Sequence, residues 1–177
     1  MQRPPSRHRP CRGLPRGLTL VELLTVAAVL VILIATAVPA MNGFAAANQI
    51  AGTRSAFGAS LALARSEAAK RGVAVIVHAR GAPAAGNEYA AGWEIVLDDN
   101  GNGVADANDT VLRRFDALPS GIALSGNSNV VYLPTGYLAT PVERTFTVCR
   151  TGGSHAGFRI AVAPSGVTDT APITTCP

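Results

Sequence analysis

Residues 18–38 read LTLVELLTVAAVLVILIATAV, and the only charged side chain among these 21 residues is Glu22. At about 1.5 Å per residue, a helix of this length is roughly 31 Å long, which matches the ~30 Å hydrocarbon core of a bilayer. The preceding segment, residues 1–17, carries five arginines and no acidic residue. By the positive-inside rule, this pattern predicts a membrane helix whose N-terminal end faces the cytoplasm.

A cleaved secretory signal with a small-residue cleavage site at Ala35, Thr36 and Ala37 is the alternative interpretation. The apolar run is longer than the roughly 7 to 15 residues of such signals, and Glu22 lies near its start, so we predict a retained helix. A carboxylate inside a membrane is unfavourable, by about 2.5–3.5 kcal/mol at a helix centre and less near an end. Glu22 therefore either reaches the lipid headgroups or pairs with a positive partner, and the residue alone leaves both open.

The composition restricts the class of protein. A chain of 177 residues that is 48% apolar and 15% charged is too small for a large multidomain enzyme and too apolar for a disordered chain. Its formal charge of +4 comes from the N-terminal arginines, because residues 18–177 contain ten basic and eleven acidic side chains. The basic balance of the whole chain therefore does not indicate nucleic-acid binding.

A second helical segment follows the apolar run. Pro39 and Gly43 interrupt the pattern and predict a kink within a single helix from Leu18 to Arg71. Helical spacing then resumes over residues 39–71, where one face carries Ile50, Phe57, Leu61, Ala64 and Ala68. Lys70, Arg71 and Gly72 predict the end of the helix, because basic residues suit its last turn and glycine suits the position after it.

Residues 72–177 change to the alternating pattern of β-strands. Seven short runs separated by turn residues are expected to be strands: 73–79, 93–97, 111–115, 122–124, 130–133, 146–149 and 158–162. We therefore predict an α+β fold in which a long N-terminal helix packs on an antiparallel β-sheet head.

Residues 16–22 read RGLTLVE, and this basic leader ending in glycine before an apolar helix resembles the processing site of type IV prepilins and type II secretion pseudopilins. The resemblance implies that a prepilin peptidase cleaves after Gly17, removes leader 1–17 and methylates the new amino terminus at Leu18. Many relatives have phenylalanine in the place of Leu18. The resemblance also implies that Glu22 pairs with the N-terminus of a neighbouring subunit in a filament.

Three stretches of the head resemble the GspH/FimT family of minor pilins and pseudopilins: residues 61–72, Gly92-Trp93 leading to Asp98, and residues 118–122. The resemblance implies a type IV pilin-like fold, a single-pass protein of the inner membrane with a periplasmic head, and other pseudopilins or pilins as partners. Some FimT-like pilins bind DNA through Gly-Arg-x-Arg near the C-terminus, where this chain has Gly166-Val167-Thr168-Asp169. This difference favours a type II secretion pseudopilin, and a minor pilin of a type IV pilus is the alternative.

Two cysteines remain once the leader, with Cys11, is removed: Cys149 and Cys176. An even pair in an oxidising periplasm predicts a disulfide, and two separate thiols are the alternative. In the chain-entropy model, closing a loop of this length stabilises a fold by roughly 3.6 kcal/mol.

Residues 98–109 read DDNGNGVADAND and fit a calcium-loop template at most positions. The expected ligands are Asp98, Asn100, Asn102, the carbonyl group of Val104, Asp106 and Asp109. Aspartate stands at the last position, where the template has glutamate, and the flanking runs predict strands rather than helices. Since Asp, Asn and Gly also favour turns, the alternative is a metal-free hairpin loop.

We find no arrangement of residues that predicts catalysis, and no cofactor motif. Arg113, Arg114, Arg150 and Arg159 are candidates for a basic patch, although arginines on strands are usually a solvated face. His78 lies in an apolar run and is expected to be packed, while Ser154 and His155 follow Cys149 in a glycine-rich turn. We therefore predict a structural subunit that functions by assembly, not an enzyme.

Overall fold

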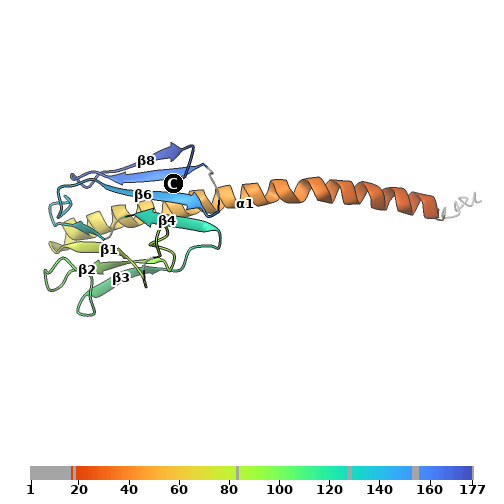
Figure 1. Ribbon diagram of the computed structural model, residues 1–177. Helices are drawn as coiled ribbons and strands as arrows, with labels where there is room; N and C mark the ends of the chain where they lie inside the picture. The colour runs from red at the N-terminus through yellow and green to blue at the C-terminus, as the bar shows by residue number, and fades with distance from the viewer. Residues whose placement is uncertain (1–16, 18, 83, 127–128, 153–155, 177) are drawn as a thin grey trace, which may run out of the picture. The chain divides into compact units, whose positions relative to one another are not determined.

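The computed structural model describes residues 17, 19–82, 84–126, 129–152 and 156–176, without the side chains of residues 37–40 and 42 (Figure 1). The chain divides into two compact units, Met1–Met41 and Asn42–Pro177. The helix α1 (Leu20–Arg71) begins in the first unit and ends in the second, which we call the head.

In the first unit, α1 begins directly after Thr19. The side-chain oxygen of Thr19 accepts a hydrogen bond of 3.2 Å from the backbone N–H of Glu22, as an N-cap residue does. Residues remain helical through Pro39 and Gly43, which confirms the prediction of a single helix, and the kink at this place stays a prediction. One proline removes only one backbone donor, and the helical hydrogen bonds on either side of it continue α1.

No helix in the described part of the chain combines the length and the hydropathy that crossing a membrane requires. The expected membrane segment, residues 18–38, is only partly covered by this finding, since Leu18 and the side chains of residues 37 and 38 lie outside the described residues.

In the head, α1 buries the face that its sequence predicts. Ile50 is 7% exposed, and the other four residues of the face, Phe57, Leu61, Ala64 and Ala68, are fully buried. The helix ends at Arg71, and Gly72 follows with a φ of 70° and donates its N–H to the carbonyl oxygen of Ala68 at 3.0 Å. The predicted helix end is thus confirmed.

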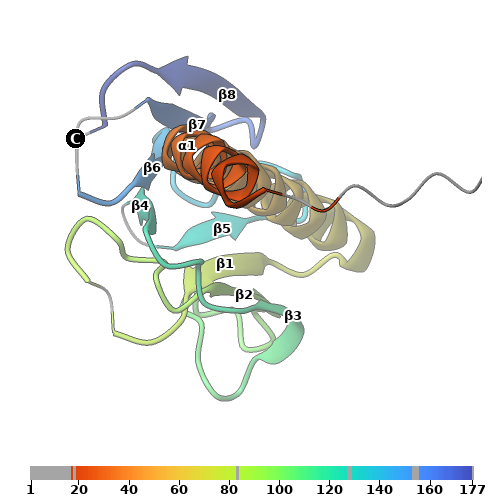
Figure 2. The same cartoon turned by 90° about the vertical axis from the view of Figure 1, so that its right-hand side faces the viewer.

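Two antiparallel sheets of four strands complete the head. The first has the order β3-β2-β1-β5, with β1 (Val75–Ala79), β2 (Trp93–Leu97), β3 (Thr110–Phe115) and β5 (Val130–Tyr132). The second has the order β4-β6-β7-β8, with β4 (Ile122–Gly126), β6 (Arg144–Arg150), β7 (Gly157–Val162) and β8 (Thr168–Ile173). Figures 1 and 2 show the head part of α1 between strands of the first sheet and strands β7 and β8 of the second. The predicted α+β fold, a helix packed on antiparallel sheet, is confirmed.

The seven expected strands correspond to β1–β7, with ends that differ by up to two residues. The eighth, β8, was not predicted, because its sequence TDTAPI contains Pro172 and no apolar alternation. A proline is accommodated there because β8 is an edge strand and pairs only with β7.

One hydrophobic core joins α1 to both sheets, and Phe57 lies inside it. The ring of Phe57 makes edge contacts with Tyr89, Trp93 and Phe146 at centroid distances of 5.2, 5.3 and 4.9 Å. The indole N–H of Trp93 also donates to the hydroxyl oxygen of Ser60 on α1 at 2.9 Å. The aromatic side chains thus hold the first sheet, the second sheet and the helix together.

Candidate functional site

The residues of the expected processing motif lie at the start of α1. Gly17 and Glu22 are exposed, while Leu18, the expected site of methylation, lies outside the described residues. Glu22 is in the first helical turn, where its charge interacts favourably with the helix dipole. Sequence reasoning missed the capping role of Thr19, although the spacing Thr19-x-x-Glu22 is a known signal of a helix start.

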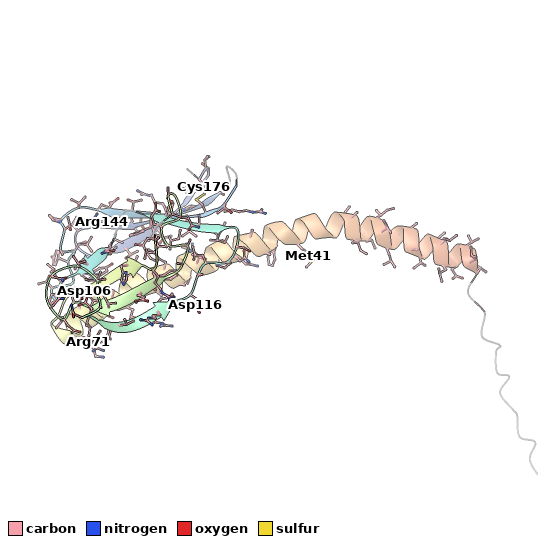
Figure 3. The ribbon with its side chains drawn as sticks, turned by 60° about the horizontal axis from the view of Figure 1, so that its bottom comes forward. Met41, Arg71, Asp106, Asp116, Arg144 and Cys176 are labelled. Carbon is pink, nitrogen blue, oxygen red and sulfur yellow. A yellow bond between two sulfur atoms is a disulfide. The ribbon has the colours of Figure 1, made fainter. Side chains whose placement is uncertain are left out.

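The structure contains the predicted disulfide between Cys149 at the end of β6 and Cys176, whose Cα atoms are 6.0 Å apart. The bond connects the segment after β8, where Figure 3 labels Cys176, to the end of β6, which is an interior strand of the second sheet. Both cysteines are buried, at 7% and 8% exposure. The bond therefore prevents the chain after β8 from separating from the sheet.

Replacement of both cysteines by serine is expected to lower the free energy of unfolding by about 3.5 kcal/mol, because the unfolded chain then regains the entropy of an open loop. Denaturant unfolding followed by tryptophan fluorescence measures the loss. A reductant should destabilise the native chain by a similar amount and leave the double variant unchanged. Equal stability of the two chains without reductant would contradict the prediction.

The loop 98–109 connects β2 to β3 and is closed by its own hydrogen bonds. The carboxylate of Asp98, which is 4% exposed, accepts the N–H groups of Asn102 and Gly103 at 3.0 and 2.9 Å. One carboxylate oxygen of Asp106 accepts the side-chain amides of Asn100 and Asn102 at 3.1 and 2.9 Å. These hydrogen bonds connect Asp98 and Asp106 to the turn at residues 100–103.

Two further contacts join the ends of this loop. Asp109 accepts the N–H groups of Asp99 and Asp106 at 3.2 and 2.9 Å. Hydrogen bonds from the backbone of Asn108 and from the side chains of Asn102 and Asn100 lower the pKa of Asp106, so this carboxylate is charged at neutral pH. Five of the six expected calcium ligands thus take part in hydrogen bonds through their side-chain oxygens, and Val104 donates its N–H to Asn102 at 2.7 Å.

Calcium binding by this loop and its alternative, a metal-free hairpin loop, both stay predictions. The donor set of oxygen atoms suits this ion, but the part of the chain that is described contains no group of three or more His, Cys, Asp or Glu side chains placed to hold a metal. A cation would have to displace N–H donors from Asp98, Asp106 and Asp109. We therefore expect circular dichroism to give the same melting temperature in calcium and in chelator. If calcium instead raises the melting temperature of the native chain and not that of the Asp98→Asn variant, the loop binds the ion.

The four arginines considered for a basic patch lie in different sheets. Arg113 and Arg114 are on β3, whereas Arg150 and Arg159 are on β6 and β7 of the second sheet, where Arg159 lies 3.9 Å from Glu143. They do not form one patch. Ser154 and His155 lie outside the described residues.

A different group of charges lies at the end of hairpin β2–β3 that is away from its loop. Glu94 on β2 is its centre, and the Nε atoms of Arg80 and Arg114 each lie 3.0 Å from its Oε1 atom. The Nε2 atom of His78 lies 3.8 Å from the Oε2 atom of Glu94. We call His78, Arg80, Glu94 and Arg114 the basic cluster. The register of the strands places His78, Glu94 and Arg114 directly opposite one another.

Sequence reasoning also missed a structural role of Arg65, which lies off the apolar face of α1. Its guanidinium donates hydrogen bonds of 3.0 Å to the carbonyl oxygens of Gly136 and Ser165. These contacts join two turns of the head to the helix across 71 and 100 residues of sequence. No local pattern could have indicated such distant acceptors.

Comparison with known proteins identifies the family. The model of the family described as "Type II transport protein GspH" matches residues 54–166, which is more than half of the chain. The chain belongs to the GspH family. The match covers the second part of α1, the whole first sheet and most of the second.

Solved structures agree with this family in their fold. The chain is similar to the type IV minor pilin FimU of Pseudomonas aeruginosa strain PAO1 in two crystal forms. The match to the first crystal form has a TM-score of 0.57 at 20% sequence identity, and it covers 73% of this chain and 96% of FimU. The match to the second has a TM-score of 0.53 at 21% identity, and it covers 75% of this chain and 98% of FimU. No curated protein matches the chain. The family and the fold are those of pilin-type structural subunits, so the chain is a GspH/FimT-like minor pseudopilin or minor pilin.

Proposed function

We propose that the chain is a minor pseudopilin of a type II secretion system, which is inserted in the inner membrane and assembles into a filament with its head in the periplasm. The observation that carries this proposal is the exposed apolar surface of α1. Eleven large apolar side chains between Leu20 and Ile34 are each at least 51% exposed. Soluble monomers rarely expose so much contiguous apolar surface, so lipid or the helices of neighbouring subunits must cover it.

The start of α1 supports processing of the chain before assembly. Gly17 is exposed next to the first turn, where a peptidase has access to it. Cleavage after Gly17 leaves Leu18 as the amino terminus, and methylation there follows the pattern of prepilins. Glu22 is then four residues from a positive charge in each subunit, and in a bundle of such helices the terminus of one subunit neutralises the carboxylate of the next.

Mass spectrometry of the native protein tests this proposal. We expect a mature N-terminus at methylated Leu18 and fractionation with the inner membrane. A mature N-terminus near Val38 or Met41, or a native chain that is soluble without detergent, would indicate a free secreted domain and contradict the proposal.

Glu22→Ala is expected to give a processed chain with a folded head that no longer enters the filament, because the unpaired amino terminus of the neighbouring subunit then remains in an apolar environment. Co-isolation with other pseudopilins measures incorporation. Glu143→Ala is the matched control, since Glu143 in the head is half exposed and its contact with Arg159 contributes little. Equal incorporation of both variants would contradict the role of Glu22.

A minor pilin of a type IV pilus is the second candidate, and the similarity to the fold of FimU favours it. The description of the family model as a type II transport protein favours the first. Immunoprecipitation from cells that contain both machines distinguishes them, because it recovers secretion pseudopilins in one case and pilus subunits in the other.

A further inference from the structure

The loop after β2 contains the acceptor motif of N-linked sugars. Residues 106–110 read DANDT, in which Asn108-Asp109-Thr110 has the form Asn-x-Ser/Thr with a middle residue other than proline. Among the eight asparagines of the sequence, Asn108 is the only one with serine or threonine two positions later. Since such a motif is used only where the fold presents it at a surface, its accessibility in the structure decides whether it is an acceptor.

Asn108 lies in an exposed turn. The N–H group of Asp109 donates to the carbonyl oxygen of Asp106 at 3.3 Å, which closes a four-residue turn with Asn108 in its third position. Asn108 and Thr110 are both exposed, and Asp109 between them is half-buried. The two side chains that the motif requires, the acceptor amide and the hydroxyl group, are therefore both on the surface.

The hydrogen bonds of this turn are compatible with a sugar on Asn108. Its backbone N–H group donates to Asp106 Oδ1 at 2.7 Å, and that of Thr110 donates to Asp99 Oδ2 at 2.9 Å. The side-chain amide of Asn108 also donates to Asp106. An amide has two N–H hydrogens and an N-linked sugar replaces one of them, so one remains for this contact. The loop can therefore keep its structure after modification.

The turn lies at the end of the head where α1 ends, and Figure 3 labels Arg71 and Asp106 there. The N–H group of Asp98, at the start of the loop, donates to the carbonyl oxygen of Ala74 at 2.9 Å. From Asn42 to Arg71, the head part of α1 is about 45 Å long. A substituent on the loop is thus far from the place where the head begins, at the opposite end of its helix.

We infer that Asn108 is an N-glycosylation site. The inference rests on that part of the proposed function which places the head outside the cytoplasm, because Asn-x-Ser/Thr acceptors are used in exported chains. The sugar donor is an oligosaccharide linked through a diphosphate to a membrane lipid, and a membrane-bound oligosaccharyltransferase transfers it to the side-chain amide.

The transfer is balanced without a redox partner. The Nδ2 atom of Asn108 forms a bond to C1 of the first sugar, and the bond between C1 and the diphosphate oxygen breaks. The electron pair of that bond leaves with the lipid diphosphate, and the amide nitrogen loses one proton to a base of the transferase. The product carries a bulky polar group at this end of the head, so contacts between heads in a filament use other faces.

Peptide mapping of the native full-length chain, isolated from the cells that make it, tests the inference. Trypsin releases residues 81–113 as one peptide, because no lysine or arginine lies between Arg80 and Arg113. We expect the mass of this peptide to exceed that of its sequence by a whole number of sugar residues. Electron-transfer fragmentation should locate the added mass on Asn108.

Variants at the two required positions separate the motif from other causes of added mass. Asn108→Gln and Thr110→Val should abolish the modification, whereas Thr110→Ser, which keeps the hydroxyl group, should retain it. Valine is a matched replacement because it has the shape of threonine and suits the start of β3. Unchanged near-ultraviolet circular dichroism of each variant establishes that its head is folded.

An unmodified Asn108 in the native chain overturns the inference, and so does added mass that persists in Asn108→Gln, which would indicate a sugar on a hydroxyl group. Equal results for Thr110→Val and Thr110→Ser also contradict it. The mature N-terminus, measured in the same sample, tests the proposed function separately. A processed N-terminus at Leu18 with a bare Asn108 overturns only the inference, whereas a glycan on Asn108 with an N-terminus near Val38 overturns only the proposed function.

Discussion

Gly92→Ala is expected to lower the free energy of unfolding by roughly 2 to 5 kcal/mol, the sum of a backbone term and a packing term. Gly92 has a φ of 88°, and left-handed backbone costs a residue with a Cβ atom about 1–2 kcal/mol. A Cβ atom at this position would lie 2.1 Å from the carbonyl oxygen of Phe115 and 2.6 Å from that of Asp116. These are backbone atoms, so the methyl group can be accommodated only if the chain after β3 moves.

That movement would disturb several hydrogen bonds around Gly92. Its N–H donates to Tyr89 at 2.9 Å and its carbonyl oxygen accepts the N–H of Arg80 at 3.0 Å. Trp93 is the only tryptophan of the sequence and directly follows Gly92. Denaturant unfolding followed by its fluorescence therefore measures the loss of stability.

Gly86→Ala is the matched control for Gly92→Ala. Gly86 has a φ of 75°, and a Cβ atom there would meet nothing within 4 Å. This variant therefore tests the backbone term alone and should lose only about 1–2 kcal/mol. Equal losses at the two positions would show that close approach to the chain after β3 does not matter.

The sequence could predict those parts of the fold that depend on local spacing. The buried face of α1 and its end at Gly72 follow from helical periodicity and from the chemistry of a helix terminus. Strand β2 was predicted with its observed ends because its apolar residues stand between glycine and aspartate turns. Strand β8 could not be predicted, since its stability comes from pairing with β7 and not from its own residues.

The basic cluster illustrates why much of the candidate site could not be predicted. Arg80 directly follows β1 and is 14 residues from Glu94 on β2, and the register of β1 with β2 brings His78 opposite Glu94. The arginines that sequence reasoning grouped together share a charge but lie in two sheets. Residue type indicates which side chains can make ion pairs, whereas strand register determines which of them do.

Phe57→Ala is expected to lower the free energy of unfolding by about 3–5 kcal/mol. Phe57 is fully buried, and its ring contacts Tyr89, Trp93 and Phe146. Removal of the ring leaves a cavity between α1 and both sheets, and collapse is limited because the helix is also held by Arg65 through two turns. Denaturant unfolding in detergent measures the loss.

The chain offers an exposed phenylalanine on the same helix as the control for this variant. Phe44 is 72% exposed in the head, so Phe44→Ala should change the free energy of unfolding by no more than about 0.5 kcal/mol. Trp93 gives an independent signal, because loss of the Phe57 ring changes the environment of its indole while the hydrogen bond to Ser60 remains available. If Phe57→Ala were as stable as Phe44→Ala, α1 could not be the element around which the two sheets pack.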